Sequence, residues 1–248
     1  MEFFFEIHKD IPREGPGDNK STQRAYNMLK GLQSKPKVLD IGCGPGMQTV
    51  ELARNTSGYI YALDTHEPFL DKLNENAKEE KVENKIKTIK GSMFALEKYF
   101  EKGELDVIWS EGAIFIIGFE EGLKRWKPFL KKEGYMVISE ISWTKENIPK
   151  EIKEFWEAEY SSINNIKDNL KLVEQCGYKL IDYFIIPESS WWNNYYNHLE
   201  KRISILRKTH DNSEEWVSRL NNTQKEIEMY RKYSECYGYV FYVMQAED

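Results

Sequence analysis

A glycine-rich turn is the segment of this 248-residue sequence best suited to hold a small ligand. Residues 38–46 read Val-Leu-Asp-Ile-Gly-Cys-Gly-Pro-Gly, so Gly42, Gly44 and Gly46 follow a short apolar run. Glycines permit a tight turn and let a ligand approach the bare backbone, while a helix after the turn presents free N–H groups. We therefore predict a ligand-binding turn at residues 42–46.

The residues around this turn favour one class of ligand over another. A dinucleotide site normally needs Gly-x-Gly-x-x-Gly, and Met47 stands where the third glycine would be. Asp40 carries a carboxylate near the end of the strand, and this charge would repel a pyrophosphate but attract an ammonium group. The turn is therefore better suited to a cationic amino-acid ligand than to a dinucleotide.

A second carboxylate, Asp64, ends the next apolar run. At such a position a carboxylate can accept hydrogen bonds from both ribose hydroxyls of an adenosine. The alternative is that Asp64 only caps the helix that starts near Pro68. Two carboxylates at successive strand ends around a glycine turn favour the ribose interpretation.

The elements that must position these residues alternate along the chain. Short apolar runs bounded by Gly, Pro, Asn or Asp predict five buried strands, at residues 37–41, 59–63, 86–90, 105–110 and 135–140. Helical spacing predicts helices near residues 49–53 and 68–81. This alternation implies right-handed crossovers and a doubly wound, mostly parallel α/β sheet, which binds ligands at the carboxyl ends of its strands.

The second half of the chain has a less regular pattern. It predicts helices at residues 148–163 and 168–175, a strand at 178–186, a helical and aromatic insertion at about 189–233, and a last strand at 237–245. The result is one domain with a seven-stranded sheet. We divide residues 1–248 into N-terminal cap helices (1–34), a cofactor-binding core (35–143) and a substrate-side half (144–248).

These segments together resemble the class I S-adenosylmethionine-dependent methyltransferases. The resemblance rests on residues 38–46, on Asp64 and on Gly-Ser-Met at residues 91–93, and it is closest to the small-molecule group that contains ubiquinone and menaquinone biosynthetic methyltransferases. Trp-Ser-Glu-Gly-Ala-Ile at residues 109–114 and Tyr-Gly-Tyr-Val-Phe at 237–241 are similar to a bacterial subset of that group. The resemblance covers nearly the whole chain and implies the Rossmann-like methyltransferase fold.

The resemblance also implies S-adenosylmethionine as cofactor and a set of residues that hold it. Asp40 would lie near the amino group of the cofactor, Asp64 on its ribose, and Ser92 and Met93 beside its adenine. Many relatives carry Asp where Ser92 stands, and a serine can accept only a weaker, neutral bond. The expected cofactor-binding set is Asp40, Gly42, Cys43, Gly44, Gly46, Gln48, Asp64, Thr65, Ser92, Met93 and Glu111.

Glu111 is the candidate catalytic residue because it follows the fourth predicted strand, where substrate and cofactor should meet. It could bind the methionine amino group, orient a substrate amine or hydroxyl, or accept a proton. The alternative is a carboxylate that caps the next helix or faces water. Methyl transfer needs a well-placed nucleophile more than a strong base, so each role is compatible with the reaction.

Two segments are expected to close over the site. Residues 12–17 form a turn-prone entry to the fold, and residues 189–196 concentrate aromatic side chains within the insertion. Aromatic faces can bind flat substrates, exclude water or attract cations, and at helical spacing they also pack. We predict Trp191, Trp192 and Tyr195 as substrate-binding residues, with packing as the alternative.

Composition and charge narrow the partners. The net charge of −6 disfavours nucleic acid, and neither the histidines nor the three separated cysteines show the spacing of metal ligands, so no metal is assigned. No export signal or membrane span is visible, and we expect a cytoplasmic protein with a small-molecule substrate. A homodimer is left open.

Three other functions remain as alternatives. Met47 argues against a dinucleotide-dependent oxidoreductase. A methyltransferase-like protein that binds cofactor without catalysis stays open, because fold and cofactor turn do not prove turnover. The acidic net charge argues against a macromolecule methyltransferase, as does the lack of Asn-Pro-Pro-Tyr or Asp-Pro-Pro-Tyr after the fourth strand, where residues 110–113 read Ser-Glu-Gly-Ala.

Overall fold

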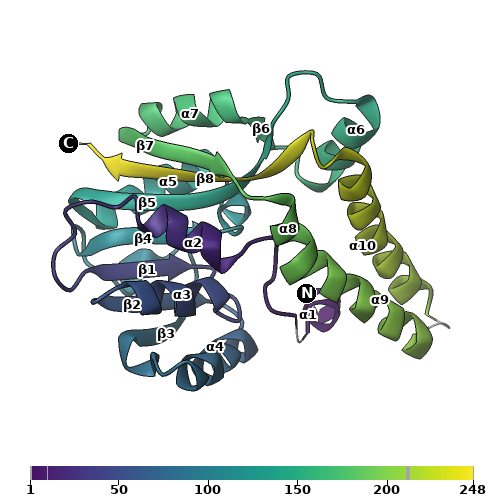
Figure 1. Cartoon of the computed structure of the whole chain (residues 1–248), viewed down its shortest axis with the longest axis horizontal. Helices are drawn as coiled ribbons and strands as arrows, with labels where there is room; N and C mark the ends of the chain where they lie inside the picture. The colour runs from purple at the N-terminus through teal and green to yellow at the C-terminus, as the bar shows by residue number, and fades with distance from the viewer. Residues whose placement is uncertain (1, 10, 211–212, 248) are drawn as a thin grey trace.

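A twisted sheet of seven long strands forms the centre of the protein (Figure 1). The structure is a computed structural model that describes residues 2–9, 11–210 and 213–247. The strand order is β3-β2-β1-β4-β5-β8-β7, in which β8 runs antiparallel to both of its neighbours and the other pairs are parallel. The strands are β1 Lys37–Ile41, β2 Tyr59–Asp64, β3 Ile86–Lys90, β4 Leu105–Glu111, β5 Leu130–Trp143, β7 Tyr178–Ile185 and β8 Tyr237–Ala246; a two-residue strand, β6 Asn164–Asn165, pairs with the end of β5. The predicted doubly wound, mostly parallel sheet is confirmed.

Helices cover both faces of this sheet because its strands are apolar on both sides. In β1, β4 and β5 adjacent residues, such as Val38 and Leu39, belong to two separate core clusters. The first cluster packs against α2 Asn19–Tyr26, α3 Met47–Asn55, α4 Glu67–Glu79 and α6 Lys150–Glu159, and the second packs against α5 Phe119–Trp126 and α7 Ile166–Gln175. Short 3₁₀ turns complete the connections: η1 Glu83–Lys85, η2 Leu96–Lys98, η3 Ile114–Ile116 and η4 Lys127–Phe129.

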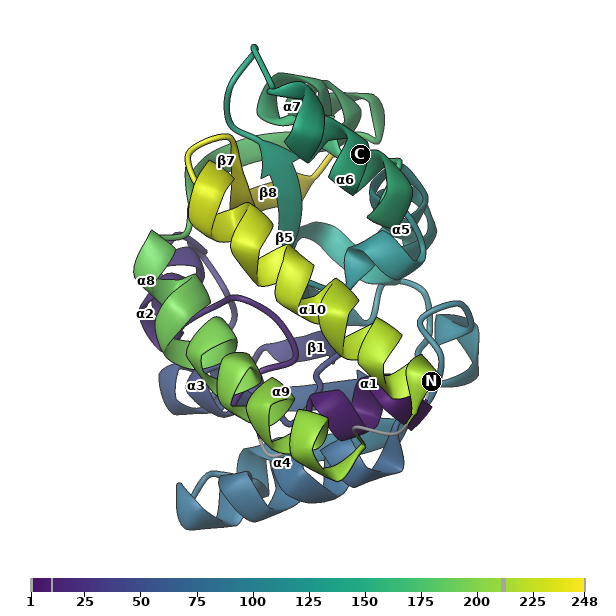
Figure 2. The same ribbon diagram turned by 90° about the vertical axis from the view of Figure 1, so that its right-hand side faces the viewer.

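The helical insertion before the last strand is also confirmed. It consists of α8 Glu188–Trp191, the π-helical turn η5 Trp192–Tyr196, α9 Asn197–Thr209 and α10 Glu214–Tyr233; residues 211–212 within it lie outside the described residues. Figures 1 and 2 show α9 and α10 running out beyond the sheet and back, with α1 Glu2–Ile7 beside them. Arg202 on α9 binds both the backbone and the carboxylate of Glu6, which fastens α1 to the insertion.

Two predicted boundaries are wrong for identifiable reasons. The helix predicted at residues 148–163 is shorter, because Pro149 occupies its N-cap and the backbone leaves the helical conformation at Tyr160 and turns at residues 161–162 before Asn165 caps the next helix. The strand predicted at residues 135–140 is longer at both ends, since its first residues pair with β4 across a shift in register. Within the described ranges, no helix has both the length and the apolar character needed to cross a membrane.

Candidate cofactor and substrate site

The glycine turn lies at the carboxyl edge of the sheet, held between β1 and β2. The backbone oxygen of Leu63 accepts hydrogen bonds from the N–H groups of Gly42 at 2.8 Å and Cys43 at 3.2 Å. Gly46 is the left-handed N-cap of α3, with φ 85°. The side-chain amide of Gln48 donates a hydrogen bond to the backbone oxygen of Cys43 at 2.9 Å, and this contact stabilises the conformation of the turn.

The three glycines of the turn serve different purposes. A Cβ atom at Gly46 would lie 2.1 Å from Leu73, and one at Gly42 would lie 2.4 Å from Ala113, so these two positions are filled by the protein itself. A Cβ atom at Gly44, where φ is 53°, would meet only the side chain of Glu14, at 3.3 Å. Gly44 is therefore the glycine of the turn whose missing side chain leaves room above the turn.

Asp40 supplies an unsatisfied acceptor beneath the turn. Its side chain is fully buried; one carboxylate oxygen accepts a 2.6 Å hydrogen bond from Thr49 and the other has no partner. Burial raises the pKa of Asp40 to about 7, and the charge of Glu111 adds to this shift. A buried unpaired acceptor is unfavourable unless a donor completes it, so this oxygen fits a cationic or hydrogen-bonding ligand.

Asp64 braces the turn from the side of β2. One of its oxygens accepts a hydrogen bond from the backbone N–H of Gly44 at 3.0 Å, and the other accepts one from the backbone N–H of His66 at 2.9 Å. His66 is the N-cap residue of α4, and its ring stacks against Phe5 of α1 at 3.5 Å. Asp64 thus joins the glycine turn to the start of α4, and its half-buried carboxylate stays at the edge where a ribose is expected.

The other predicted cofactor residues are spread around this edge. Cys43 is buried, and burial raises the pKa of its thiol well above the ordinary value, which is the opposite of an activated nucleophile. Met93 is buried in the second core cluster, whereas Thr65 is exposed. The hydroxyl of Ser92 accepts a hydrogen bond from the N–H of Phe94 at 3.3 Å.

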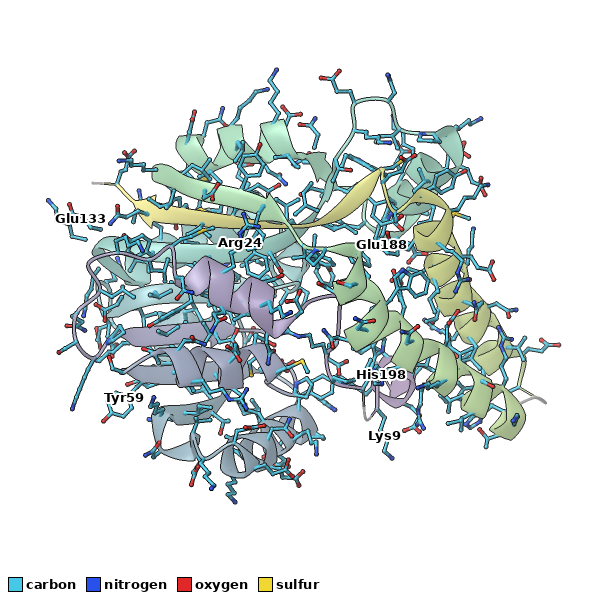
Figure 3. The ribbon with its side chains drawn as sticks, in the orientation of Figure 1. Lys9, Arg24, Tyr59, Glu133, Glu188 and His198 are labelled. Atoms are coloured by element: carbon cyan, nitrogen blue, oxygen red, sulfur yellow. The ribbon has the colours of Figure 1, made fainter. Side chains whose placement is uncertain are left out.

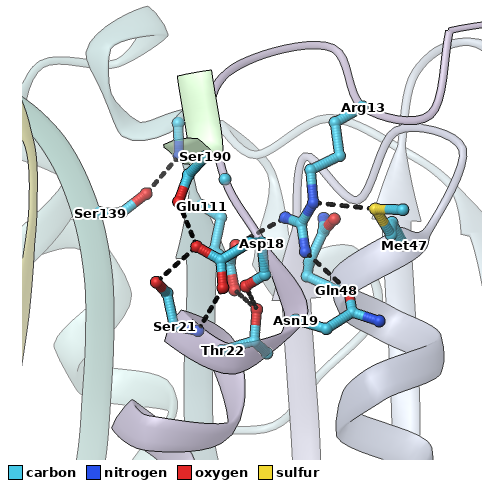
Figure 4. A network of polar contacts seen from close by, with 12 residues as sticks. Arg13, Asp18, Asn19, Ser21, Thr22, Met47, Gln48, Glu111, Ser139 and Ser190 are labelled. Carbon is cyan, nitrogen blue, oxygen red and sulfur yellow. Dashed lines mark hydrogen bonds and ion pairs between the residues drawn. The ribbon is translucent and has the colours of Figure 1, made fainter. Parts of the chain in front are cut away.

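Glu111 is enclosed by donors rather than open to a substrate. Arg13 donates to one oxygen at 2.8 Å and Thr22 donates to the other at 2.7 Å (Figure 4). The indole of Trp109 donates to the same oxygen as Thr22, at 2.9 Å. The side chains of Arg13 and Glu111 are each only 5% exposed. Glu111 therefore neither caps a helix nor faces water, and its contacts are those of a positioning residue.

Arg13 belongs to a strap, residues 11–19, that crosses the carboxyl edge of the sheet. The same guanidinium also donates to Asn19 at 3.2 Å and to the sulfur of Met47 at 3.1 Å. Asp18 caps α2 and binds the hydroxyl of Ser190 on α8 (Figure 4). The strap is thus tied both to the cofactor side of the sheet and to the helical insertion.

Glu14 lies in the strap directly above Gly44. One of its carboxylate oxygens is buried without a partner. Burial raises the pKa of Glu14 to about 8, and the nearby charge of Asp64 contributes. Together, Glu14 from above and Asp40 from below place unsatisfied acceptors on both sides of the turn.

A groove of about 1390 Å³ borders the turn on its outer side. Glu14, Pro45 and Met47 line it near the turn, while Phe3 and Trp216 line it near α1 and α10. His66 and Phe69 line its side toward α4. The groove gives a ligand access to the turn.

The aromatic residues of the insertion pack mostly against α10. Trp191 is buried and stacks on Tyr230 at 4.0 Å, and Trp192 lies under the guanidinium of Arg231 at 4.9 Å. The hydroxyl of Tyr195 forms a 3.0 Å hydrogen bond with the ring of His8. The contacts of Trp191 and Trp192 are those of packing, the alternative considered for this segment.

Three ionisable residues at this edge escaped the sequence analysis. Arg13 and Glu14 lie in a segment that was expected to close over the site, but nothing in the local sequence identifies their partners. Glu140 lies near the carboxyl end of β5, is buried, and has no hydrogen-bond partner for either oxygen. Its position at the end of a predicted strand is the signal that could have identified it, since the same signal identified Asp64.

Comparisons with known proteins bear on the fold and on the cofactor. Residues 32–202 match the family described as "Methyltransferase domain". A curated relative, the probable cobalt-precorrin-6B C(15)-methyltransferase (decarboxylating) of Saccharolobus solfataricus, is 34% identical over 146 residues. That alignment covers 55% of this chain and 66% of the relative, so the chain spans slightly less than two thirds of the relative's length.

Two solved structures have the same fold over the whole chain. A SAM-dependent methyltransferase from Thiobacillus denitrificans, in complex with S-adenosyl-L-homocysteine, is 18% identical with a TM-score of 0.85, covering 100% of this chain and 99% of that one. A SAM-dependent methyltransferase from Geobacter sulfurreducens, in the same kind of complex, is 17% identical with a TM-score of 0.84, covering 100% and 98%.

Proposed function

The chain belongs to the methyltransferase domain family, and from this premise we propose that it transfers the methyl group of S-adenosylmethionine to a small-molecule acceptor. The enzyme is a methyltransferase and its cofactor is S-adenosylmethionine. When bound, this cofactor supplies an electrophilic methyl group on a positively charged sulfur. The observation that supports a small acceptor is the enclosure of the site, because the strap at residues 11–19 and the insertion are hydrogen-bonded to each other across it.

The residues around the turn fit the proposed cofactor. Gly44 leaves room above the turn, Asp40 offers an unpaired oxygen, and the groove beside Met47 provides access. We propose that Asp64 receives the ribose, and that Gln48, Thr65, Ser92 and Met93 contribute to the walls of the site. The core at residues 35–143 would hold the cofactor, residues 1–34 would cap it, and residues 144–248 would face the substrate.

For the substrate side, we propose Tyr195 as a lining residue. Burial raises the pKa of its hydroxyl well above the ordinary value, and Glu226, Tyr239 on β8 and Glu14 add to this shift, so Tyr195 lies near residues of both the insertion and the strap. Glu111 is proposed to act on the substrate indirectly, by holding Arg13 and with it the strap. Trp191 and Trp192 would support this wall from behind.

Asp64→Ala should weaken the binding of S-adenosylmethionine by about 2 to 4 kcal/mol, because it removes two charge-assisted hydrogen bonds to the ribose. Isothermal calorimetry with S-adenosylmethionine and S-adenosylhomocysteine measures this directly, and NAD should not bind at comparable concentration. Asp182→Ala, an exposed aspartate on β7, is the matched control. Affinity for Asp64→Ala within about threefold of the unmodified protein would show that this carboxylate has another role.

Gly44→Ala and Gly46→Ala should separate cofactor binding from folding. At Gly44 the left-handed backbone costs about 1 to 2 kcal/mol of stability, and the added methyl group should reduce cofactor affinity by about tenfold or more. At Gly46 the methyl group would overlap Leu73, so the main loss should be in the free energy of unfolding. Urea unfolding and calorimetry on both variants test this; equal effects on stability would contradict it.

The small-molecule acceptor is tested with labelled S-adenosylmethionine. A cell extract is divided by ultrafiltration into a metabolite fraction and a protein and nucleic-acid fraction, and each is incubated with the enzyme. Label should enter the metabolite fraction. Label that appears only in the macromolecular fraction would replace this proposal with a macromolecule methyltransferase.

A further inference from the structure

Glu140 is a buried acid next to the place where substrate and cofactor should meet. Its neighbour Ser139 pairs with Glu111 at the end of β4 and accepts a 2.9 Å hydrogen bond from the N–H of Gly112. Glu140 itself is 2% exposed, and neither of its carboxylate oxygens has a hydrogen-bond partner. A carboxylate in this condition needs either a proton or a cation from outside the protein.

Aromatic side chains from three elements surround this position. Burial raises the pKa of Glu140 to about 8, and the nearby hydroxyl of Tyr160, just after α6, opposes this shift in part. The ring of Phe115 contacts Tyr160, with centroids 5.9 Å apart. On β8, the ring of Tyr239 lies 3.6 Å from where a Cβ atom of Gly112 would be.

Two other ionisable groups near Glu140 and Tyr239 already have hydrogen-bond partners. Tyr242 binds the hydroxyl of Ser142 at 2.8 Å and the amide of Asn169 at 3.1 Å, so it is not a partner for Glu140. Glu226 of α10, whose charge also acts on Tyr239, accepts a 2.9 Å hydrogen bond from Tyr196. Burial raises the pKa of Glu226 to about 7.

The three ionisable carboxyl groups of this region, Glu14, Glu140 and Glu226, lie along one set of aromatic rings. Glu140 and Glu226 act on Tyr239, and Glu14 and Glu226 act on Tyr195. The rings of Tyr239, Trp191, Tyr196 and Tyr195 contact one another in turn, with centroids 5.1 to 5.6 Å apart, so the three acids border one aromatic wall. Among the described residues, no Lys, Arg or His neutralises any of the three. Arg13, the cation nearest to Glu14 in the chain, forms its ion pair with Glu111 instead. Three acids without a cation among them favour a ligand that brings its own positive charge, since a cation stabilises their ionised form, and the faces of the rings attract it as well.

We propose that the acceptor is a primary or secondary amine, whose nitrogen binds to Glu140 between Tyr160 and Tyr239, beside Gly112. We call these four residues the amine site. The inference rests on the proposed function and adds the chemical class of the substrate. An amine nitrogen fits because it can donate to both free oxygens of Glu140 while its alkyl groups contact the rings.

The proton balance of the reaction suits this arrangement. Binding of the ammonium displaces the proton of Glu140 to solvent and leaves an ammonium–carboxylate pair. The ammonium then gives one of its own protons to the Glu140 carboxylate and becomes a neutral amine with a free lone pair. The lone pair forms the new N–C bond as the S–C bond breaks, and the electron pair of that bond stays on sulfur, leaving neutral S-adenosylhomocysteine. The methylated ammonium departs and leaves Glu140 protonated, as it was before the substrate bound.

The test compares amines with alcohols of the same shape. Benzylamine and 2-phenylethylamine, with benzyl alcohol and 2-phenylethanol as their partners, are titrated by calorimetry into protein saturated with S-adenosylhomocysteine. Each amine should bind about tenfold or more tightly than its alcohol. In Glu140→Gln the amines should lose about tenfold in affinity, while the alcohols should change by less than about threefold.

The matched control is Glu133→Gln, an exposed glutamate on the same strand that Figure 3 places at the far end of the sheet from the insertion. It should leave all four affinities unchanged. Failure of S-adenosylhomocysteine itself to bind would count against the proposed function. Normal binding of S-adenosylhomocysteine, with amines that bind no better than alcohols or with no effect of Glu140→Gln, would overturn the amine site alone.

Discussion

Glu111→Ala is expected to lower the free energy of unfolding by about 3 to 5 kcal/mol, because it leaves the guanidinium of Arg13 buried without its counter-charge. Arg13 is 4% exposed as a whole residue, so water cannot take the place of the lost carboxylate. Thr22 and Trp109 also lose their acceptor. Urea unfolding monitored by tryptophan fluorescence measures the change. Glu104→Ala removes a half-exposed ion pair with Lys37 and should cost less than about 1 kcal/mol, which makes it the control.

The double variant Arg13→Met with Glu111→Gln separates positioning from catalysis. Glutamine keeps an oxygen for Thr22 and Trp109, and methionine leaves no buried charge, so most of the lost stability should return. If Glu111 only holds the strap, turnover should return with stability to within about tenfold of the original enzyme. A double variant that folds normally but has no turnover would assign Glu111 to the chemical step, as the sequence alone had suggested.

The sheet and the glycine turn were predictable because their signals are local. Val38 and Leu39 are adjacent, and a strand that is apolar at both positions must be covered on both faces. The turn after it is defined by three glycines within five residues, and a parallel sheet brings the turn and Asp64 to one edge regardless of the distant chain. Such features need no knowledge of tertiary contacts.

The closure of the site could not be predicted in the same way. Arg13 contacts Glu111, 98 positions away in the sequence, and Asp18 contacts Ser190, 172 positions away, so no periodicity links the partners.

The aromatic residues at 191–196 illustrate a second limit. A tryptophan on a helix has the same pattern whether it packs on Tyr230 or faces a substrate, and only the position of α10 decides between the two.

Glu140 shows a third limit. The apolar run at residues 135–138 is followed by Ser139 and Glu140, and two polar residues after such a run are typical of the end of a strand, so the prediction ended at Glu140. The strand instead continues to Trp143, because Ile141 and Trp143 pair with β8. Glu140 therefore lies within the strand, three residues before its end, and is covered by neighbouring elements.

Glu140→Gln is expected to stabilise the protein increasingly as the pH rises. The pKa of Glu140 is raised from 4.5 to about 8 by burial, so the folded protein holds a proton on Glu140 that the unfolded chain releases above about pH 4.5. The stability of the original protein is therefore full below that pH and declines until the folded state also releases the proton near pH 8. Glutamine carries no such proton, so the stability gained by Glu140→Gln should grow through this window and then level off.

The difference in stability between the original protein and Glu140→Gln reports on the Glu140 carboxyl group alone. Asp40, Glu14 and Glu226 titrate in the same range but are present in both, and burial keeps the pKa values of Tyr160, Tyr239 and Tyr242 above their ordinary value. Because each unit of pKa is worth about 1.4 kcal/mol, the gain between pH 5 and pH 9 should be on the order of 4 kcal/mol in urea unfolding. Glu133→Gln, exposed on the same strand, should show no pH-dependent gain. A gain for Glu140→Gln that is equal at pH 5 and pH 9 would mean that Glu140 is ionised in the folded protein throughout, held by a cation, and that it does not carry the proton which amine transfer requires it to exchange.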